Sequence, residues 1–191
     1  MSITSFVIYC IIVTFSPGPT NIVILSTVHN YGTKKALRYT YGATIAFGVL
    51  LAISALLNTL LITFIPRIIL AIQIIGSLYM LYLAYQIYKM DTTKASSNNT
   101  ATFKSGFLMQ FLNPKVILFT MTVIPSYILP NYMEKYAVSM SVIGITFIGF
   151  LAFTTWIVFG KVFKRFLQSH SKLVNVTLAL FLVYSATMVW F

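Results

Sequence analysis

The sequence Ser16-Pro17-Gly18-Pro19-Thr20-Asn21 interrupts an otherwise apolar stretch that runs from Ser2 to Ser26. Pro17 and Pro19 cannot both lie in an unbroken helix, because each proline lacks an amide donor and crowds the preceding turn. In the hydrocarbon core of a membrane, carbonyls freed in this way have no water to bond. Such a break survives only where protein buries it or a wet cavity surrounds it. The stretch therefore predicts a membrane helix whose break is a candidate substrate site.

The composition of the 191 residues agrees with a membrane location. Hydrophobic residues make up 59% of the chain and charged residues 8%, and the mean hydropathy is +0.90. These values lie far outside the range of a soluble domain. We predict one all-α integral membrane domain over residues 1–191. Its six transmembrane helices are expected at about 3–27, 38–63, 66–88, 107–128, 137–160 and 173–190, since each span needs roughly 20 residues.

A polar, low-complexity linker at about 89–104 divides the chain into halves of about 1–90 and 105–191. Three helices in each half would make the second half enter the membrane from the opposite side, as in inverted repeats. The first helix of each half has a proline break beside an asparagine, namely Asn21 and Asn113. Matched breaks in equivalent helices point to a binding site between two inverted three-helix repeats.

The distribution of basic residues predicts the orientation. The net charge of +11 comes from 13 Lys/Arg against Asp91 and Glu134. Most of the basic residues fall in the predicted loops of one side: Lys34, Lys35, Arg38, Lys89, Lys94, Lys104, Lys161, Lys164, Arg165 and Lys172. The other side has Arg67 and Lys135. The positive-inside rule then places the linker in the cytoplasm and both termini outside a bacterial plasma membrane. This charge suits anionic lipid headgroups, and we expect no nucleic-acid partner.

Several functions are excluded by the residue types. Cys10 is the only cysteine, so the chain alone forms no internal disulfide, thiol relay or thiolate metal cage. His29 and His170 have no partner at ligand spacing, and no Asp or Glu lies inside a predicted span. No nucleophile–base set and no phosphate-binding loop occurs. We therefore expect no catalytic residue, no metal and no cofactor, and we predict a transporter rather than an enzyme.

The candidate substrate-binding residues lie at the two breaks and in the third predicted helix. Asn21 either repairs the first break by bonding freed carbonyls or contacts a polar ligand. The helix that resumes after Pro19 offers a positive dipole end to a carboxylate. Lys115, the only charge within a predicted span, either binds substrate or extends toward the headgroups. The full candidate set is Pro17, Gly18, Pro19, Asn21, Gln73, Tyr79, Gln110, Asn113, Pro114 and Lys115.

Small residues in the second and third predicted helices indicate close helix contacts. Gly42, Ala46 and Gly48 lie in the second predicted helix, and Gly76 lies in the third. In membrane helices such residues let two backbones approach each other closely. We expect these positions to pack against neighbouring helices rather than to bind a ligand.

At these residues the chain resembles the LysE/RhtB family of bacterial amino-acid exporters, over its full length. The resemblance rests on the Ser16–Asn21 stretch, Gly42 with Gly48, Ile75-Gly76-Ser77-Leu78-Tyr79, Tyr82-Leu83-Ala84-Tyr85, Ser105-Gly106-Phe107 and Phe111-Leu112-Asn113-Pro114-Lys115. The helix count and the linker position also match. The resemblance implies a secondary transporter that moves amino acids out of the cytoplasm.

Two stretches, 109–119 and 175–184, look most like the branch that exports cysteine and O-acetylserine. Val49 follows Gly48 where many relatives carry an aspartate, which argues against a basic substrate. The resemblance thus implies a small neutral amino acid or derivative as the substrate. The alternatives are an exporter or channel for another small metabolite or ion, and a membrane scaffold that transports nothing. The oligomeric state stays open, with a homo-oligomer among the options.

Overall fold

A computed structural model describes residues 3–89, 101–130, 132, 134–188 and 190, and within these residues every regular element is helical. The elements are α1 (Ile3–Phe15), α2 (Pro19–Tyr31), α3 (Thr33–Leu56), α4 (Asn58–Tyr88), α5 (Phe103–Leu112), α6 (Pro114–Val123), the π-helical turn η1 (Ile124–Ile128), α7 (Lys135–Val162), α8 (Lys164–Ser169) and α9 (Ser171–Met188). The prediction of an all-α chain is confirmed for these ranges. Most of the predicted linker at 89–104 lies outside them.

Both predicted helix breaks are present. The axes of α1 and α2 differ by 49°, and the axis of α5 differs by 67° from that of α6 with η1. Pro19 and Pro114 each lie at the start of the resumed helix, where the missing amide costs no helical hydrogen bond. The prolines therefore end one helical segment and begin the next.

The described structure supports fewer membrane spans than the six that the sequence predicts. Among the described residues, three helical stretches are long and apolar enough to cross a membrane, namely Thr33–Leu56, Leu70–Tyr88 and Lys135–Val162. Counting each bent pair as one span raises the number to five. The apolar stretch Ser171–Thr187 of α9 is shorter than these. The described structure thus supports three to five spans, and a sixth remains a prediction.

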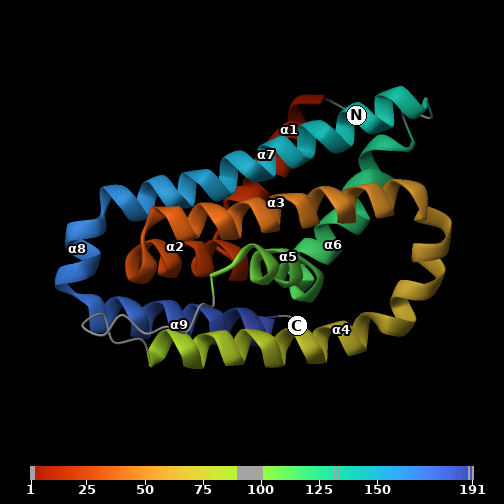
Figure 1. Cartoon of the computed structure of the whole chain (residues 1–191). Helices are drawn as coiled ribbons and strands as arrows, with labels where there is room; N and C mark the ends of the chain where they lie inside the picture. The colour runs from red at the N-terminus through yellow and green to blue at the C-terminus, as the bar shows by residue number, and fades with distance from the viewer. Residues whose placement is uncertain (1–2, 90–100, 131, 133, 189, 191) are drawn as a thin grey trace.

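The predicted end of the second helix at residue 63 is wrong. The Leu57 N–H makes the last helical bond of α3, to the Ile53 carbonyl at 2.9 Å, but the Leu57 backbone leaves the helical conformation with φ −111° and ψ 22°, and α4 begins at Asn58. The first part of α4 crosses one end of the bundle before the helix turns along it (Figure 1, right). Asn58, Thr59, Pro66 and Arg67 interrupt the apolar residues in this segment, but the apolar residues between them concealed the end of α3. The helix α8 also lies in a segment that the sequence assigned to a loop.

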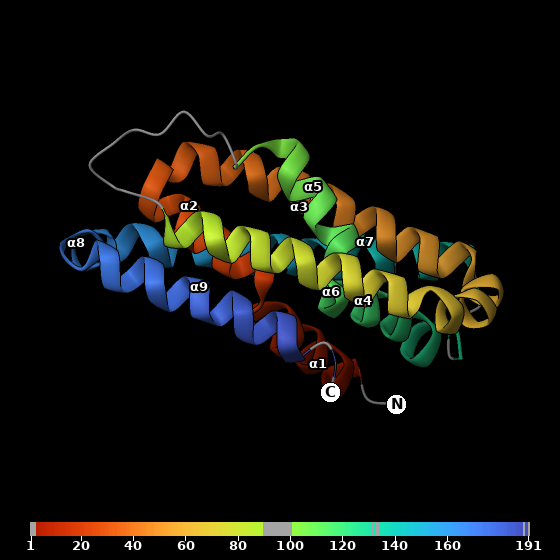
Figure 2. The same ribbon diagram turned by 90° about the horizontal axis from the view of Figure 1, so that it is seen from below.

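The long helices are arranged as two antiparallel pairs. The helix α3 lies against α7, and α4 lies against α9 (Figures 1 and 2). The ends of α2, α4 and α7 and the starts of α3 and α9 gather at the end of the bundle that carries α8 (Figure 1, left). Many of the loop cations belong to these helix ends, for example Lys34 and Lys35 at the start of α3 and Lys161 at the end of α7.

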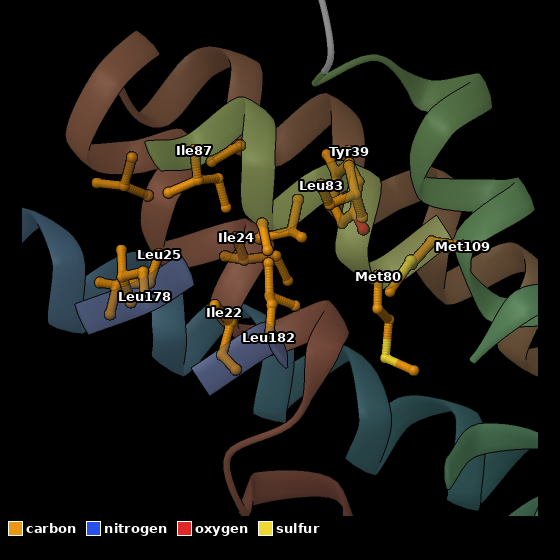
Figure 3. Close-up of a cluster of buried hydrophobic side chains, with 14 of the residues drawn as sticks. Ile22, Ile24, Leu25, Tyr39, Met80, Leu83, Ile87, Met109, Leu178 and Leu182 are labelled. Atoms are coloured by element: carbon orange, nitrogen blue, oxygen red, sulfur yellow. The ribbon is translucent and has the colours of Figure 1, made fainter. Parts of the chain in front are cut away.

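Two clusters of buried apolar side chains hold the bundle together. The first surrounds α2, whose Ile22, Ile24 and Leu25 point toward side chains of α4 and α9 (Figure 3). The second joins α1, α3, α6, η1 and α7 around Phe47 and Phe119. Outside these clusters, large apolar side chains are exposed along the helices, for example Ile143 at 61% on α7. An apolar outer surface of this kind suits contact with lipid.

Glycines mark the closest helix crossings. A Cβ at Gly42 of α3 would collide with the carbonyl oxygen of Phe103, and one at Gly106 of α5 would collide with that of Tyr39. A Cβ at Gly76 of α4 would likewise collide with the Leu112 carbonyl. The close contacts predicted for Gly42 and Gly76 are therefore confirmed. These crossings fix the position of α5, and hence of the second break, against α3 and α4.

Candidate functional site

The first break exposes carbonyl groups that Asn21 partly satisfies. Pro17 and Pro19 carry no N–H for the carbonyls of Val13 and Phe15, and the helix itself is interrupted between Phe15 and Pro19. The side-chain amide Nδ2 of Asn21 donates to the carbonyl oxygens of Thr14 at 3.1 Å and of Ser16 at 2.9 Å. Asn21 is buried. Its amide group therefore repairs the break, which was one of the two roles expected for it.

Two side chains from distant elements satisfy the remaining carbonyls. The indole Nε1 of Trp156 in α7 donates to the carbonyl oxygen of Phe15 at 3.2 Å. The ammonium Nζ of Lys115 in α6 donates to the Ser16 hydroxyl at 2.8 Å and to the carbonyl oxygens of Ser16 at 3.1 Å and Pro17 at 3.3 Å. Lys115 thus connects the break in the first half of the chain to the break in the second.

A buried cluster of polar side chains lies next to this connection. The side-chain amides of Gln110 and Asn113 both donate to the hydroxyl oxygen of Thr20 at 3.0 Å. The Oδ1 atom of Asn113 accepts the backbone N–H of Lys115 at 3.1 Å and so caps α6. Thr20, Gln110 and Asn113 are each at most 3% exposed. The structure therefore brings the predicted residues Asn21, Gln110, Asn113 and Lys115 together and adds Thr20.

Hydrogen-bonding capacity remains unused around the break. The oxygens Asn21 Oδ1 and Gln110 Oε1 are buried and have no hydrogen-bond partner among the described residues. Gly18 precedes α2 without a side-chain cap and Pro19 has no N–H, so the amides of Thr20 and Asn21 are the donors without an acceptor inside α2. The site can thus offer acceptors and donors to a ligand that carries both charges.

A cavity of about 30 Å³ lies at the junction of the two breaks. Its lining residues are Val13, Thr14, Gly18, Thr20, Asn21, Phe47, Asn113, Lys115, Val116, Phe119 and Phe153. One wall is polar and the other is aromatic, with the Phe47 ring 5.9 Å from Phe119 and 6.4 Å from Phe153. A buried water needs roughly 10–15 Å³ of such space. This volume has room for about two waters and is smaller than an amino acid.

The other predicted site residues have different positions. Pro17 contributes its carbonyl to Lys115, whereas Pro19 and Pro114 are buried at helix starts. Gln73 and Tyr79 of α4 are half-buried and do not line the cavity. Substrate contact by these two residues stays a prediction. Among the described residues, no group of three or more His, Cys, Asp or Glu side chains is placed to hold a metal ion.

A bundle of apolar helices that encloses two facing polar breaks has the organisation of a membrane transporter. Comparison with known proteins identifies its family. Residues 11–190 match the family model for the LysE type translocator, and the chain belongs to that family. It is therefore a translocator rather than an enzyme, as predicted, and a multi-pass protein of the bacterial inner membrane.

Several relatives are named cysteine/O-acetylserine efflux protein. The protein from Klebsiella pneumoniae subsp. pneumoniae is 33% identical over 96% of this chain and 94% of its own length. The protein from Salmonella typhimurium is 29% identical, with 100% and 98% covered, and that from Escherichia coli is 27% identical, with 99% and 97% covered. No solved structure matches the chain. The resemblance drawn from the sequence motifs is thus confirmed at the level of the family.

Proposed function

We propose that the chain is a secondary transporter that exports small neutral amino acids or derivatives, such as cysteine and O-acetylserine, from the cytoplasm. The names of the relatives and their nearly full-length similarity support this substrate class. The observation that carries the mechanism is the bridge between the two helix breaks, in which the Lys115 ammonium bonds the Ser16 and Pro17 carbonyls. Around this bridge, uncharged carbonyl and amide groups can bind a zwitterion, which carries one positive and one negative charge.

The first break presents opposite partial charges to the two ends of an amino acid. The carbonyl end of α1 is negative and the amide end of α2 is positive. We assign the substrate ammonium to the carbonyls of Ser16 and Pro17 and to the unpartnered Oδ1 of Asn21. We assign the substrate carboxylate to the first amides of α2 and to Lys115. Substrate entry would therefore move the Lys115 ammonium from the carbonyls to the carboxylate.

The rest of the cavity favours a small, uncharged side chain. Phe47, Phe119 and Phe153 form the wall opposite the polar groups. Among the residues that line the cavity there is no acidic side chain to pair with a basic substrate. A third charge on the substrate would have to enter an apolar space at a large desolvation cost. The site should consequently reject lysine and arginine.

We also propose that the chain has six spans in two inverted three-helix repeats, with α9 as the sixth span. The pairs α3 with α7 and α4 with α9 would be equivalent elements of the two halves, and each pair is antiparallel. The bent helices at 49° and 67° would be the first members of the repeats. The end of the bundle with the basic helix termini would face the cytoplasm, which leaves both termini outside.

Efflux from whole cells tests the proposed function. Cells with and without the chain are loaded with radiolabelled cysteine, O-acetylserine, alanine, lysine or arginine, and loss of label is followed. We expect faster loss of cysteine and O-acetylserine in cells that carry the chain, with no change for lysine and arginine. If the protein is present in the membrane and the loss of every neutral amino acid is unchanged, the proposed function is wrong. Export of lysine would contradict the assignment of the charges.

A further inference from the structure

Gly149 contacts an aromatic residue of the cavity wall but does not itself line the cavity. Gly149 of α7 is buried against the ring of Phe47 of α3. A Cβ built at Gly149 would lie 2.6 Å from Phe47 Cε1 and 2.7 Å from Phe47 Cδ1. Phe47 lines the cavity and Gly149 does not. Gly149 therefore contacts a ring of the cavity wall without lining the cavity itself.

The Phe47 ring has little freedom in other directions. Phe47 is 2% exposed, stacks on Phe119 with 17° between the ring planes, and meets Phe153 edge-on at 69°. Ordinary contact between carbon atoms requires roughly 3.5–4 Å. A methyl group at position 149 must therefore displace the ring by about 1 Å. Because Phe47, Phe119 and Phe153 line the cavity together, a displaced Phe47 ring would change the shape of the cavity wall.

We propose that Gly149 sets the depth of the side-chain pocket and thereby limits the size of the substrate side chain that the protein exports. Gly149 is a positioning residue that acts through Phe47. The inference rests on the proposed function, because it takes the cavity at the two breaks as the substrate site. In an apolar pocket, one methylene changes discrimination between substrates by roughly 10–200-fold. A shift of the Phe47 ring by about 1 Å is close to the length of one methylene, so we expect a change in discrimination of similar size.

The substitution Gly149→Ala tests the inference, with Gly144→Ala as its control. Gly144 lies on the same helix and is exposed, and a Cβ added there meets no atom within 4 Å. The assay is uptake of labelled O-acetylserine and of cysteine, the smaller substrate, into inverted membrane vesicles. We expect Gly149→Ala to raise the KM for O-acetylserine at least about tenfold, and the KM for cysteine by less than about twofold. Gly144→Ala should leave both KM values unchanged.

Two variants of Phe47 separate pocket depth from a general loss of structure. Phe47→Leu should lower the KM for O-acetylserine relative to that for cysteine, because the wall becomes smaller. Combined with Gly149→Ala, it should return the ratio of the two KM values toward that of the wild type. An equal loss of both substrates in Gly149→Ala, or an unchanged ratio in Phe47→Leu, overturns the inference. A wild-type protein that transports neither substrate instead contradicts the proposed function.

Discussion

The residues at the first helix break combine a structural role with a proposed role in binding. Side chains from α2, α6 and α7 donate to the carbonyls of residues 14–17. A buried carbonyl without a partner costs about 1–3 kcal/mol, so these bonds stabilise a break that would otherwise be costly. Asn21 uses its Nδ2 for this purpose and keeps its buried Oδ1 without a partner. Repair and ligand contact are therefore compatible in the same side chain.

Lys115 provides the sharpest test at the scale of one residue. If its ammonium meets the substrate carboxylate, Lys115→Gln removes a charge-assisted hydrogen bond worth about 1.5–3 kcal/mol. That loss corresponds to a rise of roughly ten- to a hundredfold in the half-saturating substrate concentration. Lys115→Arg should rescue only part of it, because a planar guanidinium does not replace a compact ammonium. The measurement is the concentration dependence of uptake into inverted vesicles.

A second lysine provides the control for this experiment. Lys104 is exposed at the start of α5, and Lys104→Gln should leave the kinetics unchanged. Wild-type kinetics for Lys115→Gln would mean that Lys115 does not contact the substrate. Its ammonium would then serve only to hold the two breaks together or to reach the headgroups, and Asn21 and Asn113 would carry the site.

Several polar residues at the two breaks could be predicted from the sequence, whereas Thr20 and the apolar residues of the cavity could not. Asn21, Gln110, Asn113 and Lys115 are conspicuous because amides and charges are rare within apolar spans. Phe47, Phe119 and Phe153 are not, since phenylalanine occurs along many of these helices. Trp156 bonds a carbonyl 141 residues away, a contact that no local pattern encodes. Gln73 and Tyr79 were candidates from the third predicted helix, but the sequence could not show which neighbours that helix meets.

At the scale of helices, glycines decide how closely the elements approach. Proline positions predicted both breaks, because a proline removes an amide donor and kinks or breaks a helix. The end of α3 at Leu56 was missed, because the apolar residues resume at Leu60 after only two polar residues, Asn58 and Thr59. The partner of α3 was also not predictable. Gly42 marks a close contact, and only the structure shows that α5 crosses there through Gly106.

The crossing of α3 and α5 predicts a loss of stability in Gly106→Ala. The added Cβ would collide with the backbone carbonyl of Tyr39, which cannot move aside as a flexible side chain can. Overpacking of this kind typically costs about 1–3 kcal/mol. The midpoint of thermal unfolding in detergent should therefore fall. Gly144→Ala should keep the midpoint or raise it slightly, because alanine favours helices. Equal midpoints for the two variants would contradict the close crossing.

At the scale of the whole molecule, charge and topology predict the orientation in the membrane. A reporter that is active only in the cytoplasm should be inactive when fused after Phe191 and active when fused after Tyr88. The reason is that the basic helix ends are retained on the cytoplasmic side. A reporter that is active only outside should give the reverse result. A strong cytoplasmic signal from the fusion after Phe191 would overturn the arrangement with six spans.

The hydrogen bonds at the first break also impose an order on biosynthesis. The carbonyls of Ser16 and Phe15 are made early, but their donors Lys115 and Trp156 follow 99 and 141 residues later. At roughly 5–20 residues per second, the ribosome needs on the order of ten seconds to reach Trp156. During that interval the carbonyls of Phe15 and Ser16 lack the donors Trp156 and Lys115. A helix made early in this sequence thus completes its hydrogen bonds only after most of the second half has been synthesised.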